Sequence, residues 1–362
     1  MNPNIKNLLV TGGAGFIGAN FVHYWLKKYS GTLVVLDALT YAGNRANLSL
    51  VENIKNFHFV QGDIGDIDLT CHLIREHNID TIVNFAAESH VDRSISGPDI
   101  FIETNIVGTH TLLKAARKMW LETESPLIGH RFHHVSTDEV YGTLETGEPA
   151  FTELTAYAPN SPYSASKAAS DHLVRAYHQT YGLNVTISHC SNNYGPYQFP
   201  EKLIPLVITN ILQNQPIPIF GDGKQIRDWL YVDDHSYGLE LILMKGVPGQ
   251  NYNIGDNNEW QNLDIVNLIC KKVDNFFLNN TGFQKQYPQA HAAMSGKSNS
   301  LIRFVKDRPG HDRRYAIDAD KAFNALGFKP SEPFDKGINK TIQWYLENPG
   351  WWLNILKGNR SK

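Results

Sequence analysis

The chain has 362 residues, of which 42% are hydrophobic and 19% are charged, and its formal net charge is -3 at pH 7. This balance is typical of a globular protein with room for two domains, and no block of like charges indicates a nucleic-acid or membrane partner. No stretch approaches the roughly 20 apolar residues of a membrane-spanning helix. Three scattered cysteines indicate a reducing compartment rather than a disulfide framework, so we expect a cytoplasmic protein.

Short apolar runs alternate with amphipathic segments through the first half of the chain. Strands are expected at residues 7–10, 32–37, 57–60, 81–86, 131–135 and 184–188. The longer segments between them, such as 16–29 and 66–77, have the periodicity of helices. Strict alternation of strand and helix predicts an α/β fold, with a Rossmann-type doubly wound parallel sheet that carries helices on both faces.

A glycine-rich turn, VTGGAGFIG, follows the first expected strand and opens the first expected helix. Gly13, Gly15 and Gly18 match G-x-G-x-x-G, while Gly12, Gly15 and Gly18 match the variant G-x-x-G-x-x-G. Glycines permit a tight turn and let backbone N–H groups approach a pyrophosphate at the helix amino terminus. The next strand ends at Asp37, 19 residues after Gly18, where a carboxylate would bind the adenosine ribose and repel a 2′-phosphate. The pattern predicts NAD rather than NADP as the cofactor.

Two later strand ends are further candidates for the cofactor site. Asp63 follows the third expected strand, where it could either meet the adenine edge or cap the next helix. The fourth strand ends in FAAES, residues 85–89, and these small residues would leave room for the nicotinamide half.

Two adjacent carboxyl groups, Asp138 and Glu139, follow the fifth expected strand in the motif STDEVYG. Hydride transfer alone does not require such a pair, so a second chemical step is indicated if both groups are catalytic. Mutual repulsion and unequal burial can hold neighbouring carboxyl groups in opposite protonation states, as a general acid and a general base require. The alternative is that both are solvated loop residues.

A helix with clear start and stop signals is expected next, with Ser161 as N-cap, Pro162 at the first helical position and Gly182 just past the end. Tyr163 and Lys167 are four residues apart and therefore share one face of this helix. The lysine cation is expected to lower the pKa of the phenol, which gives a base able to take a proton from a sugar or alcohol hydroxyl. A surface pair is the alternative, but the glycine-rich turn upstream favours a catalytic one.

From about residue 190, Pro, Gly and charged residues become frequent, which predicts a smaller, loop-rich C-terminal α/β substrate domain. We expect domains at residues 1–190 and 191–362, with a segment near 228–258 returning to the first domain. Ligands of doubly wound sheets bind beyond the carboxyl ends of the strands, so the second domain should close over that edge. Residues 275–300 are expected to form an irregular surface connection.

Two clusters receive structural rather than chemical interpretations. Trp344, Trp351 and Trp352 are expected to serve in tertiary packing or a subunit contact, in preference to a ligand role. His133 and His134 are adjacent on an expected strand and so point to opposite faces. No Cys or His pair has zinc-like spacing, and we expect no metal.

The order of these motifs resembles the extended short-chain dehydrogenase/reductase family over essentially the whole chain, and within it the 4,6-dehydratases of nucleotide sugars. The resemblance is carried by the segments TGGAGFIG, AAESHVDRSI, STDEVYG, YSASKAASDHLV, NNYGPYQFPEKLIPL, GDGKQIRDWLYVDDH and DRPGHDRRYAID. Ala19 and Phe220 are mild departures, at positions where Ser and Tyr are more usual.

The resemblance implies five catalytic residues. Tyr163, beside Lys167, would take the proton of the sugar C4 hydroxyl while Thr137 hydrogen-bonds the same oxygen. Glu139 would remove the C5 proton as a base, and Asp138 would protonate the departing C6 hydroxyl as an acid. NAD would carry the hydride from C4 and return it to C6, so it is regenerated in each cycle.

The resemblance also implies the contacts with both ligands. The cofactor contacts are Gly12, Gly15, Phe16, Ile17, Gly18, Asp37, Ala38, Leu39, Thr40, Asp63, Ile64, Phe85, Ala86, Ala87, Ser89, Thr104, Tyr163, Lys167 and Asn193. The substrate contacts are Ser89, Thr137, Asn192, Lys202, Leu203, Pro218, Ile219, Phe220, Arg227, Asn262, Asp307, Arg308, Pro309, Gly310 and His311.

The expected substrate is dTDP-glucose, which would lose water without net oxidation, and the expected assembly is a homodimer. The alternatives are a sugar-nucleotide 4-epimerase, a dehydratase of another nucleotide sugar, and a non-catalytic NAD-binding sensor. The paired carboxyls argue against the epimerase, and the intact set of Thr137, Tyr163 and Lys167 argues against the sensor. The identity of the base rests on the resemblance alone.

Overall fold

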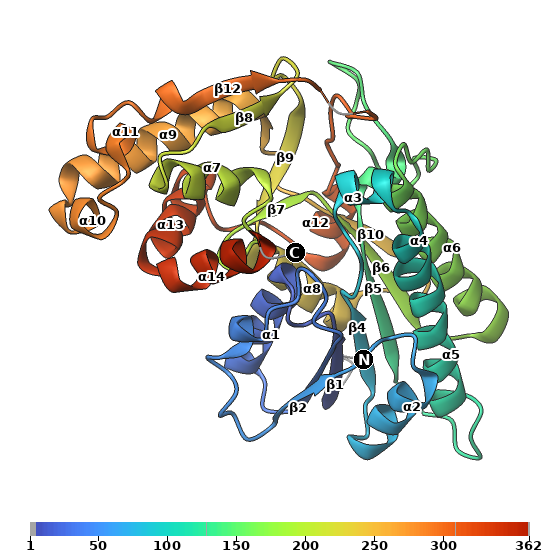
Figure 1. Cartoon of the computed structure of the whole chain (residues 1–362). Helices are drawn as coiled ribbons and strands as arrows, with labels where there is room; N and C mark the ends of the chain where they lie inside the picture. Colours follow the sequence, from blue (N-terminus) through green and yellow to red (C-terminus); the bar gives the residue numbers. More distant parts are fainter. Residues whose placement is uncertain (1–4, 128, 308, 361–362) are drawn as a thin grey trace.

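A seven-stranded sheet with the strand order β10-β6-β5-β4-β1-β2-β3 forms the centre of the first domain (Figure 1). The computed structural model describes residues 5–127, 129–307 and 309–360. All neighbouring strands of this sheet run parallel, which confirms the predicted Rossmann-type fold. Its strands are β1 (Asn7–Thr11), β2 (Thr32–Asp37), β3 (Phe57–Gln61), β4 (Thr81–Asn84), β5 (Arg131–Thr137), β6 (Val185–Cys190) and β10 (Asn251–Ile254).

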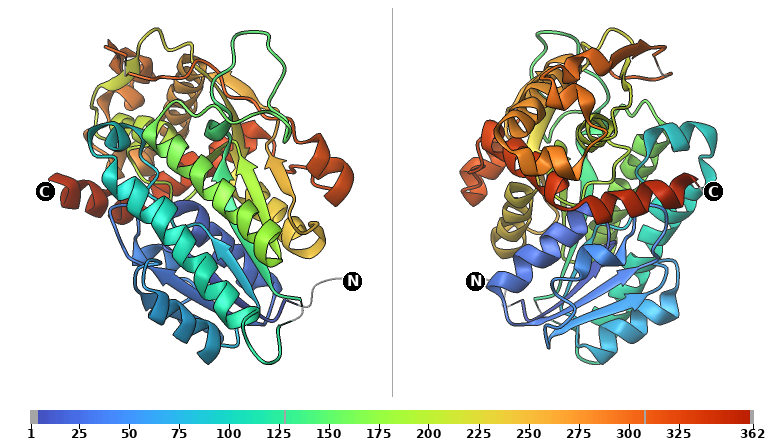
Figure 2. Two further views of the ribbon diagram at one scale, coloured as in Figure 1. Left: turned by 90° about the vertical axis from the view of Figure 1, so that its right-hand side faces the viewer. Right: turned by 60° about the vertical axis from the view of Figure 1, so that its left-hand side comes forward.

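Helices cover both faces of this sheet, as the two views of Figure 2 show. One face carries α1 (Phe16–Lys28) and α8 (Val232–Lys245), and the other carries α2 (Ile67–Glu76), α5 (Thr109–Trp120) and α6 (Pro162–Tyr181). Successive residues of a strand point to opposite faces. Leu8 and Val10 therefore enter the core beneath α1 and α8, while Leu9 enters the core beneath α2 and α5.

Several short elements lie between a strand of this sheet and the next helix or strand. They are η1 (Arg45–Leu48), α3 (Val91–Ser96), α4 (Asp99–Phe101), the π-helix η2 (Ile102–Gly108) and η3 (Asp138–Tyr141). Of these, η2 continues directly into α5, and η3 follows the carboxyl end of β5. All of them therefore lie at or near the edge of the sheet where the strands end.

The second domain is built on a three-stranded sheet of order β11-β9-β7 and a two-stranded sheet of β12 and β8. Its strands are β7 (Asn192–Tyr194), β8 (Ile217–Phe220), β9 (Ile226–Tyr231), β11 (Glu259–Gln261) and β12 (Ile302–Val305). Its helices are α7 (Leu203–Leu212), α9 (Asn262–Asn279), α10 (Thr281–Gln286), α11 (His291–Met294), η4 (Ser298–Leu301), α13 (Phe334–Glu347) and α14 (Pro349–Arg360), whereas α12 (Asp320–Leu326) packs against α8 and β10 of the first domain. Apolar side chains from α7, α9, α13 and α14 form one core beneath these sheets.

Residues 275–300 are not the irregular surface connection that we expected. They contain the end of α9, both short helices α10 and α11, and the start of η4. Phe277, Tyr287 and Ala290 are buried in the core of the second domain. The expectation was wrong because helices of six and four residues are too short to show a helical period in the sequence.

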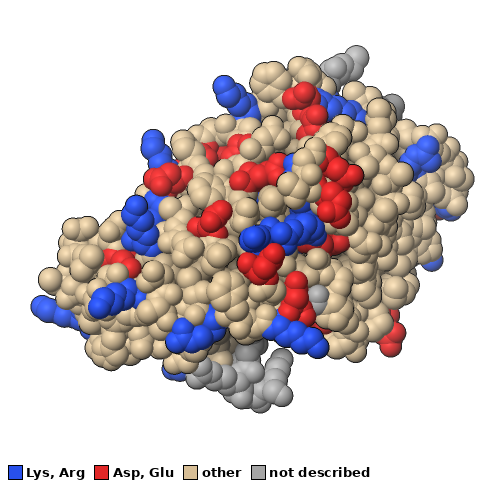
Figure 3. Space-filling view, turned by 90° about the horizontal axis from the view of Figure 1, so that it is seen from above, with Lys and Arg blue, Asp and Glu red and all other residues tan. Residues whose placement is uncertain are grey.

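The chain returns to the first domain after β9. Helix α8 packs beside α1, and β10 pairs in parallel with β6, so that Asn251 lies opposite Ile187. The surface seen in Figure 3 has acidic and basic side chains interspersed over the same face. Within the described part of the chain, no helix has the length and apolar character needed to cross a membrane.

Candidate active site

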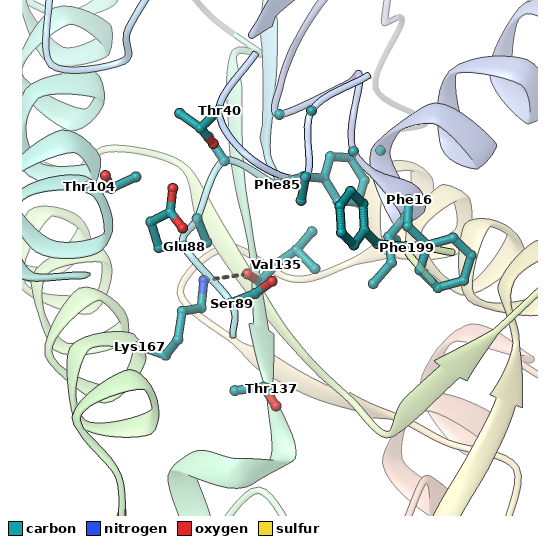
Figure 4. Close-up of a pocket in the computed structure, with 18 of the residues that line it drawn as sticks. Phe16, Thr40, Phe85, Glu88, Ser89, Thr104, Val135, Thr137, Lys167 and Phe199 are labelled. Carbon is teal, nitrogen blue, oxygen red and sulfur yellow. Dashed lines mark hydrogen bonds between the residues drawn. The ribbon is translucent and has the colours of Figure 1, made fainter. Parts of the chain in front are cut away.

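A cavity of about 300 Å³ lies at the carboxyl ends of the parallel strands, within the size range of small-ligand sites. It brings together most of the residues that we expected to bind the cofactor. The expected residues that line it are Gly12, Gly15, Phe16, Ile17, Gly18, Asp37, Ala38, Thr40, Asp63, Ile64, Phe85, Ala86, Ala87, Ser89, Thr104, Thr137, Asp138, Glu139, Tyr163, Lys167, Asn192, Asn193 and Lys202. Figure 4 shows Thr40, Glu88 and Thr104 on one side of it and Phe16, Phe85 and Phe199 on another.

The glycine-rich turn forms a backbone cradle at the start of α1. Gly12 has φ +69°, and a Cβ atom there would lie 2.6 Å from the backbone nitrogen of Ala86. A Cβ atom on Gly18 would lie 2.3 Å from the Gly12 carbonyl oxygen. Gly15 occupies the N-cap position of α1 but has no side chain that could accept a hydrogen bond from the helix. The first N–H groups of the helix are therefore left for a ligand. This geometry suits the pyrophosphate of a dinucleotide.

Asp37 supports the cradle from the end of β2. Its Oδ2 accepts a hydrogen bond from the Ala14 N–H at 2.8 Å, and its Oδ1 accepts one from the Leu39 N–H at 2.8 Å. Burial raises the pKa of Asp37, and these two backbone donors oppose that rise. Leu39 itself does not line the cavity, and its backbone contributes to the site by holding Asp37.

The motif STDEVYG places two carboxyl groups in unequal surroundings. Asp138 is 2% exposed, whereas Glu139 is only partly buried. The Thr137 hydroxyl donates to Asp138 Oδ1 at 3.2 Å, and the Glu139 N–H donates to the Thr137 Oγ1 at 3.3 Å. Burial raises the pKa of Asp138 well above its usual value, and the neighbouring charges of Glu139 and Asp228 raise it further. Of the pair, Asp138 is therefore the one whose surroundings favour the protonated form.

Tyr163 and Lys167 enter the cavity from the first turns of α6. The helix begins as the sequence indicates, with Ser161 as N-cap in a capping box with Ser164 and Gly182 at its end in the left-handed conformation. Lys167 Nζ donates to the Val135 carbonyl oxygen at 2.9 Å, as the dashed line in Figure 4 shows.

The effect that we expected of Lys167 on Tyr163 is not found. Burial raises the pKa of Tyr163 well above its usual value, and the charges of Glu139 and Cys190 add to the rise, while a hydrogen bond with Thr137 opposes it. The reason is that the ammonium group is directed at the strand backbone and at His134, whose Nε2 lies 3.4 Å away. Helical spacing predicts a shared face but not the direction in which a long side chain bends.

A buried polar network behind Lys167 was missed in the sequence. Asp171 Oδ2 accepts hydrogen bonds from the Ser136 hydroxyl at 2.9 Å and the Tyr157 hydroxyl at 3.1 Å, and lies 3.1 Å from His189 Nε2. Burial lowers the pKa of Lys167, and the Asp171 charge opposes that effect. Asp171 is thus the buried counter-charge of the lysine. The i, i+4 spacing of Lys167 and Asp171 was the one signal that could have revealed it.

The remaining substrate candidates lie in the second domain and are not among the residues that line the cavity. Arg227 donates to the Asp312 carbonyl at 3.0 Å, and its guanidinium lies 4.2 Å from the centre of the Tyr315 ring. Asp307 Oδ2 accepts from the Gln225 amide at 3.1 Å. The others in this group are Leu203 at the start of α7, Pro218, Ile219 and Phe220 in β8, Asn262 at the start of α9, and Pro309, Gly310 and His311 beyond β12. Arg308 lies outside the described residues.

Further cavity residues went unnoticed in the sequence. Glu88 and Glu201 both line the cavity, next to the expected Ser89 and Lys202. Glu201 lies 3.3 Å from His90 Nε2 and 3.6 Å from an Arg93 guanidinium nitrogen. Glu88 precedes Ser89 in AAESHVD, and Glu201 precedes Lys202 in FPEK. This adjacency to expected ligand-binding residues was the signal in the sequence that could have revealed them. In the described ranges, no group of three or more His, Cys, Asp or Glu side chains is arranged to hold a metal.

Comparison with known proteins gives the same family as the motifs. A family model described as GDP-mannose 4,6 dehydratase matches residues 9–341. The chain is 50% identical to a dTDP-glucose 4,6-dehydratase of Escherichia coli, with 97% of each chain covered. It is 54% identical to one from Xanthomonas campestris pv. campestris (strain B100), with 97% of this chain and 96% of the relative covered.

Solved structures show the same similarity. A dTDP-glucose 4,6-dehydratase from Streptomyces venezuelae, crystallised with NAD and TYD bound, is 44% identical and superimposes with a TM-score of 0.85, covering 97% of this chain and all of that one. A UDP-glucose 4-epimerase from Thermotoga maritima is 25% identical, with a TM-score of 0.79 and 95% of this chain covered. The chain therefore belongs to the 4,6-dehydratase family of nucleotide-sugar enzymes that the GDP-mannose 4,6 dehydratase model describes, as its motifs predicted.

Proposed function

We propose that this protein is an NAD-dependent dTDP-glucose 4,6-dehydratase, which converts dTDP-glucose into dTDP-4-keto-6-deoxyglucose and water. The observation that carries the proposal is the pair of unequal carboxyl groups, Asp138 buried and Glu139 partly exposed, in the same cavity as Tyr163 and Lys167. The relatives named dTDP-glucose 4,6-dehydratase, at 50% and 54% identity, support the choice of nucleotide sugar.

The cradle residues fit NAD. Gly12, Gly15 and Gly18 would hold the pyrophosphate by backbone N–H groups, because any side chain at Gly12 or Gly18 would collide with backbone atoms. Asp37 would accept hydrogen bonds from the adenosine ribose. When bound, NAD accepts the hydride from the sugar C4 and returns it to C6, so no external oxidant or reductant is consumed.

The protein side chains move the protons. Tyr163 takes the proton of the C4 hydroxyl as its phenolate, a form that the burial of this residue disfavours, and the Thr137 hydroxyl holds the same oxygen. Burial lowers the pKa of Lys167, and the charge of Asp171 opposes that effect and favours the ammonium form in the cavity. The C5 hydrogen becomes acidic once C4 is a carbonyl.

Elimination then uses both carboxyl groups. Glu139, the more exposed of the two, removes the C5 proton as a base and returns a proton to C5 when the hydride is delivered to C6. Asp138, whose pKa is raised by burial, acts as the acid and donates its proton to the C6 hydroxyl, which leaves as water. An epimerase needs neither proton transfer.

The test uses purified protein with NAD supplied, incubated separately with dTDP-glucose, UDP-glucose and GDP-mannose. Loss of one water from the dTDP sugar in preference to the other two, measured by mass spectrometry, is the expected result. An unchanged mass with inversion at C4 would make the protein an epimerase. Faster dehydration of the UDP or GDP sugar would keep the reaction type but replace the substrate.

We also propose that the protein is a cytoplasmic homodimer. Ile100, Ile102 and Val107 on α4 and η2 are 46%, 45% and 53% exposed, and exposed apolar side chains gathered on neighbouring turns are typical of an interface. Its three cysteines are free and buried, in keeping with a reducing compartment. Light scattering should give twice the chain mass for wild type and a lower mass for Val107→Glu, and a monomeric wild type would refute the dimer.

A further inference from the structure

The C-terminal helix α14 belongs to the core of the second domain but also contacts the first. In Figure 1 it passes close above α1. Trp352 on this helix is fully buried in the second-domain core. Its neighbour Trp351 faces the first domain instead, and its indole N–H donates to the Asn47 Oδ1 at 2.7 Å across 304 residues of sequence.

Asn47 also contacts the glycine-rich turn. It lies in η1 and is 1% exposed. Its amide nitrogen donates to the Ala14 carbonyl oxygen at 2.8 Å, and the Asn44 N–H donates to the same oxygen at 3.0 Å. The Asn47 amide therefore has one hydrogen bond to the C-terminal helix and one to the cofactor cradle.

Ala14 links Asn47 to Asp37, the carboxylate expected to bind the adenosine ribose. The Ala14 N–H donates to Asp37 Oδ2 at 2.8 Å. Three successive hydrogen bonds thus join Trp351 to Asp37 through Asn47 and Ala14, with lengths of 2.7, 2.8 and 2.8 Å. Asn47 and Ala14, which form the middle of the path, are both buried.

The indole of Trp351 is held in place by aromatic contacts. Its ring centroid lies 5.0 Å from that of Trp344 and 6.1 Å from that of Tyr197, with near-perpendicular rings in both pairs. Edge-to-face packing of this kind orients the N–H group before the hydrogen bond forms. The tryptophan cluster therefore does more than fill the core of the second domain.

We propose that Trp351 is a positioning residue for the cofactor: through Asn47 and Ala14 it fixes the glycine-rich turn and Asp37, so that the C-terminal helix controls how tightly NAD is held. The inference rests on the proposed function in one respect, that NAD is the ligand of the cradle. It assigns a role to α14, which contributes no residue to the cavity wall.

The test variant is Trp351→Phe, which keeps an aromatic ring and removes the N–H donor. Trp260→Phe is the matched control, because the Trp260 indole N–H also donates to an asparagine, Asn258, at 2.8 Å, and within the described residues the other hydrogen bonds of Asn258 run to Asp228 and Trp229 of β9 rather than to the cradle. NAD affinity of each cofactor-free protein is measured by calorimetry, and turnover of dTDP-glucose is measured at saturating NAD.

Trp351→Phe should bind NAD about fivefold more weakly or worse, since Asn47 is left with a buried, unpaired oxygen. Its turnover at saturating NAD should stay within about twofold of wild type, and Trp260→Phe should match wild type in both measurements. Asn47→Ala should add little to the effect of Trp351→Phe, because both remove the same link.

Two results would overturn the inference. Equal NAD affinity in wild type and Trp351→Phe would show that the link does not position the cradle. Equal losses of affinity in Trp351→Phe and Trp260→Phe would show a general packing effect. Failure of wild type itself to bind NAD would instead refute the proposed function, and the inference would fall with it.

Discussion

Replacing Asp138 by Asn isolates the proton that the proposed elimination requires. The amide has the shape of the neutral carboxylic acid and can keep the hydrogen bond from Thr137, which is 3.2 Å long in the wild-type protein. It cannot give a proton to a leaving hydroxyl group. Because burial raises the pKa of Asp138 and so favours its neutral form, the substitution should alter the chemistry and leave the packing unchanged.

The expected loss is large and confined to one step. General acid catalysis contributes about 10²- to 10⁴-fold to a rate, or roughly 3 to 5 kcal/mol of activation free energy. Dehydration by Asp138→Asn should fall by that factor, while C4 oxidation should persist because Thr137, Tyr163 and Lys167 are untouched. The variant should accumulate bound reduced nicotinamide on mixing with dTDP-glucose.

The same substitution should change how stability depends on pH. The pKa of Asp138 is raised in the folded protein, so above about pH 4 the folded chain binds one more proton than the unfolded chain. Wild-type stability therefore contains a contribution that is complete below pH 4 and falls by about 1.4 kcal/mol per pH unit until the folded pKa is reached. An asparagine side chain does not titrate, so it adds no such pH dependence. The free energy of unfolding of the variant should therefore rise relative to that of wild type as the pH increases from 4.

Urea unfolding at a series of pH values and stopped-flow absorbance of the nicotinamide together provide the assay. The reasoning is refuted if Asp138→Asn turns over at the wild-type rate, since no acid would then be missing. It is also refuted if the stability difference between the two proteins is independent of pH, since Asp138 would then be ionised in the folded state. Asp138→Ala, which leaves a cavity, serves as the packing control.

Three further substitutions test other parts of the site. Glu139→Gln should bind NAD normally but stop exchange of the C5 hydrogen with solvent, followed by mass spectrometry in deuterated water. Asp171→Asn should lower the pKa of Lys167, shift the basic limb of the pH–rate profile to lower pH, and destabilise the fold by about 3 kcal/mol in urea, since a buried charge loses its partner. Gly18→Ala would place a Cβ atom 2.3 Å from the Gly12 carbonyl oxygen and should abolish NAD binding measured by calorimetry.

The cofactor half of the site could be predicted because its residues follow one another at strand ends. In a parallel sheet the carboxyl ends of all strands lie at one edge. A motif that directly follows a strand is therefore predicted to lie at that edge. The turn at Gly12 to Gly18, Asp37 at the end of β2 and Thr137 at the end of β5 all reach one cavity for this reason. For these residues, the position in the local sequence is enough to predict the position in the fold.

The rest depends on contacts that no local pattern encodes. Asp171, Tyr157 and His189 meet although they come from α6, a loop and β6, and the direction of Lys167 is set by the Val135 carbonyl of a third element. The link from Trp351 to Asn47 spans nearly the whole chain. Most of the substrate residues were available only through family resemblance, because those in β8, β9 and beyond β12 come from separate elements of the chain.

The pairing of β10 with β6 has a consequence for synthesis on the ribosome. Strand β6 ends at Cys190 and all six of its residues are buried in the finished protein, but the strand that covers its outer edge ends only at Ile254. A nascent chain that has emerged as far as residue 190 therefore exposes an unpaired β-edge, which is a template for intermolecular pairing. Some 60 more residues, including β7 to β9, must emerge before this edge is closed. A fragment that ends at residue 190 should accordingly aggregate when expressed alone, whereas one extended through Ile254 would have the strand that closes its sheet.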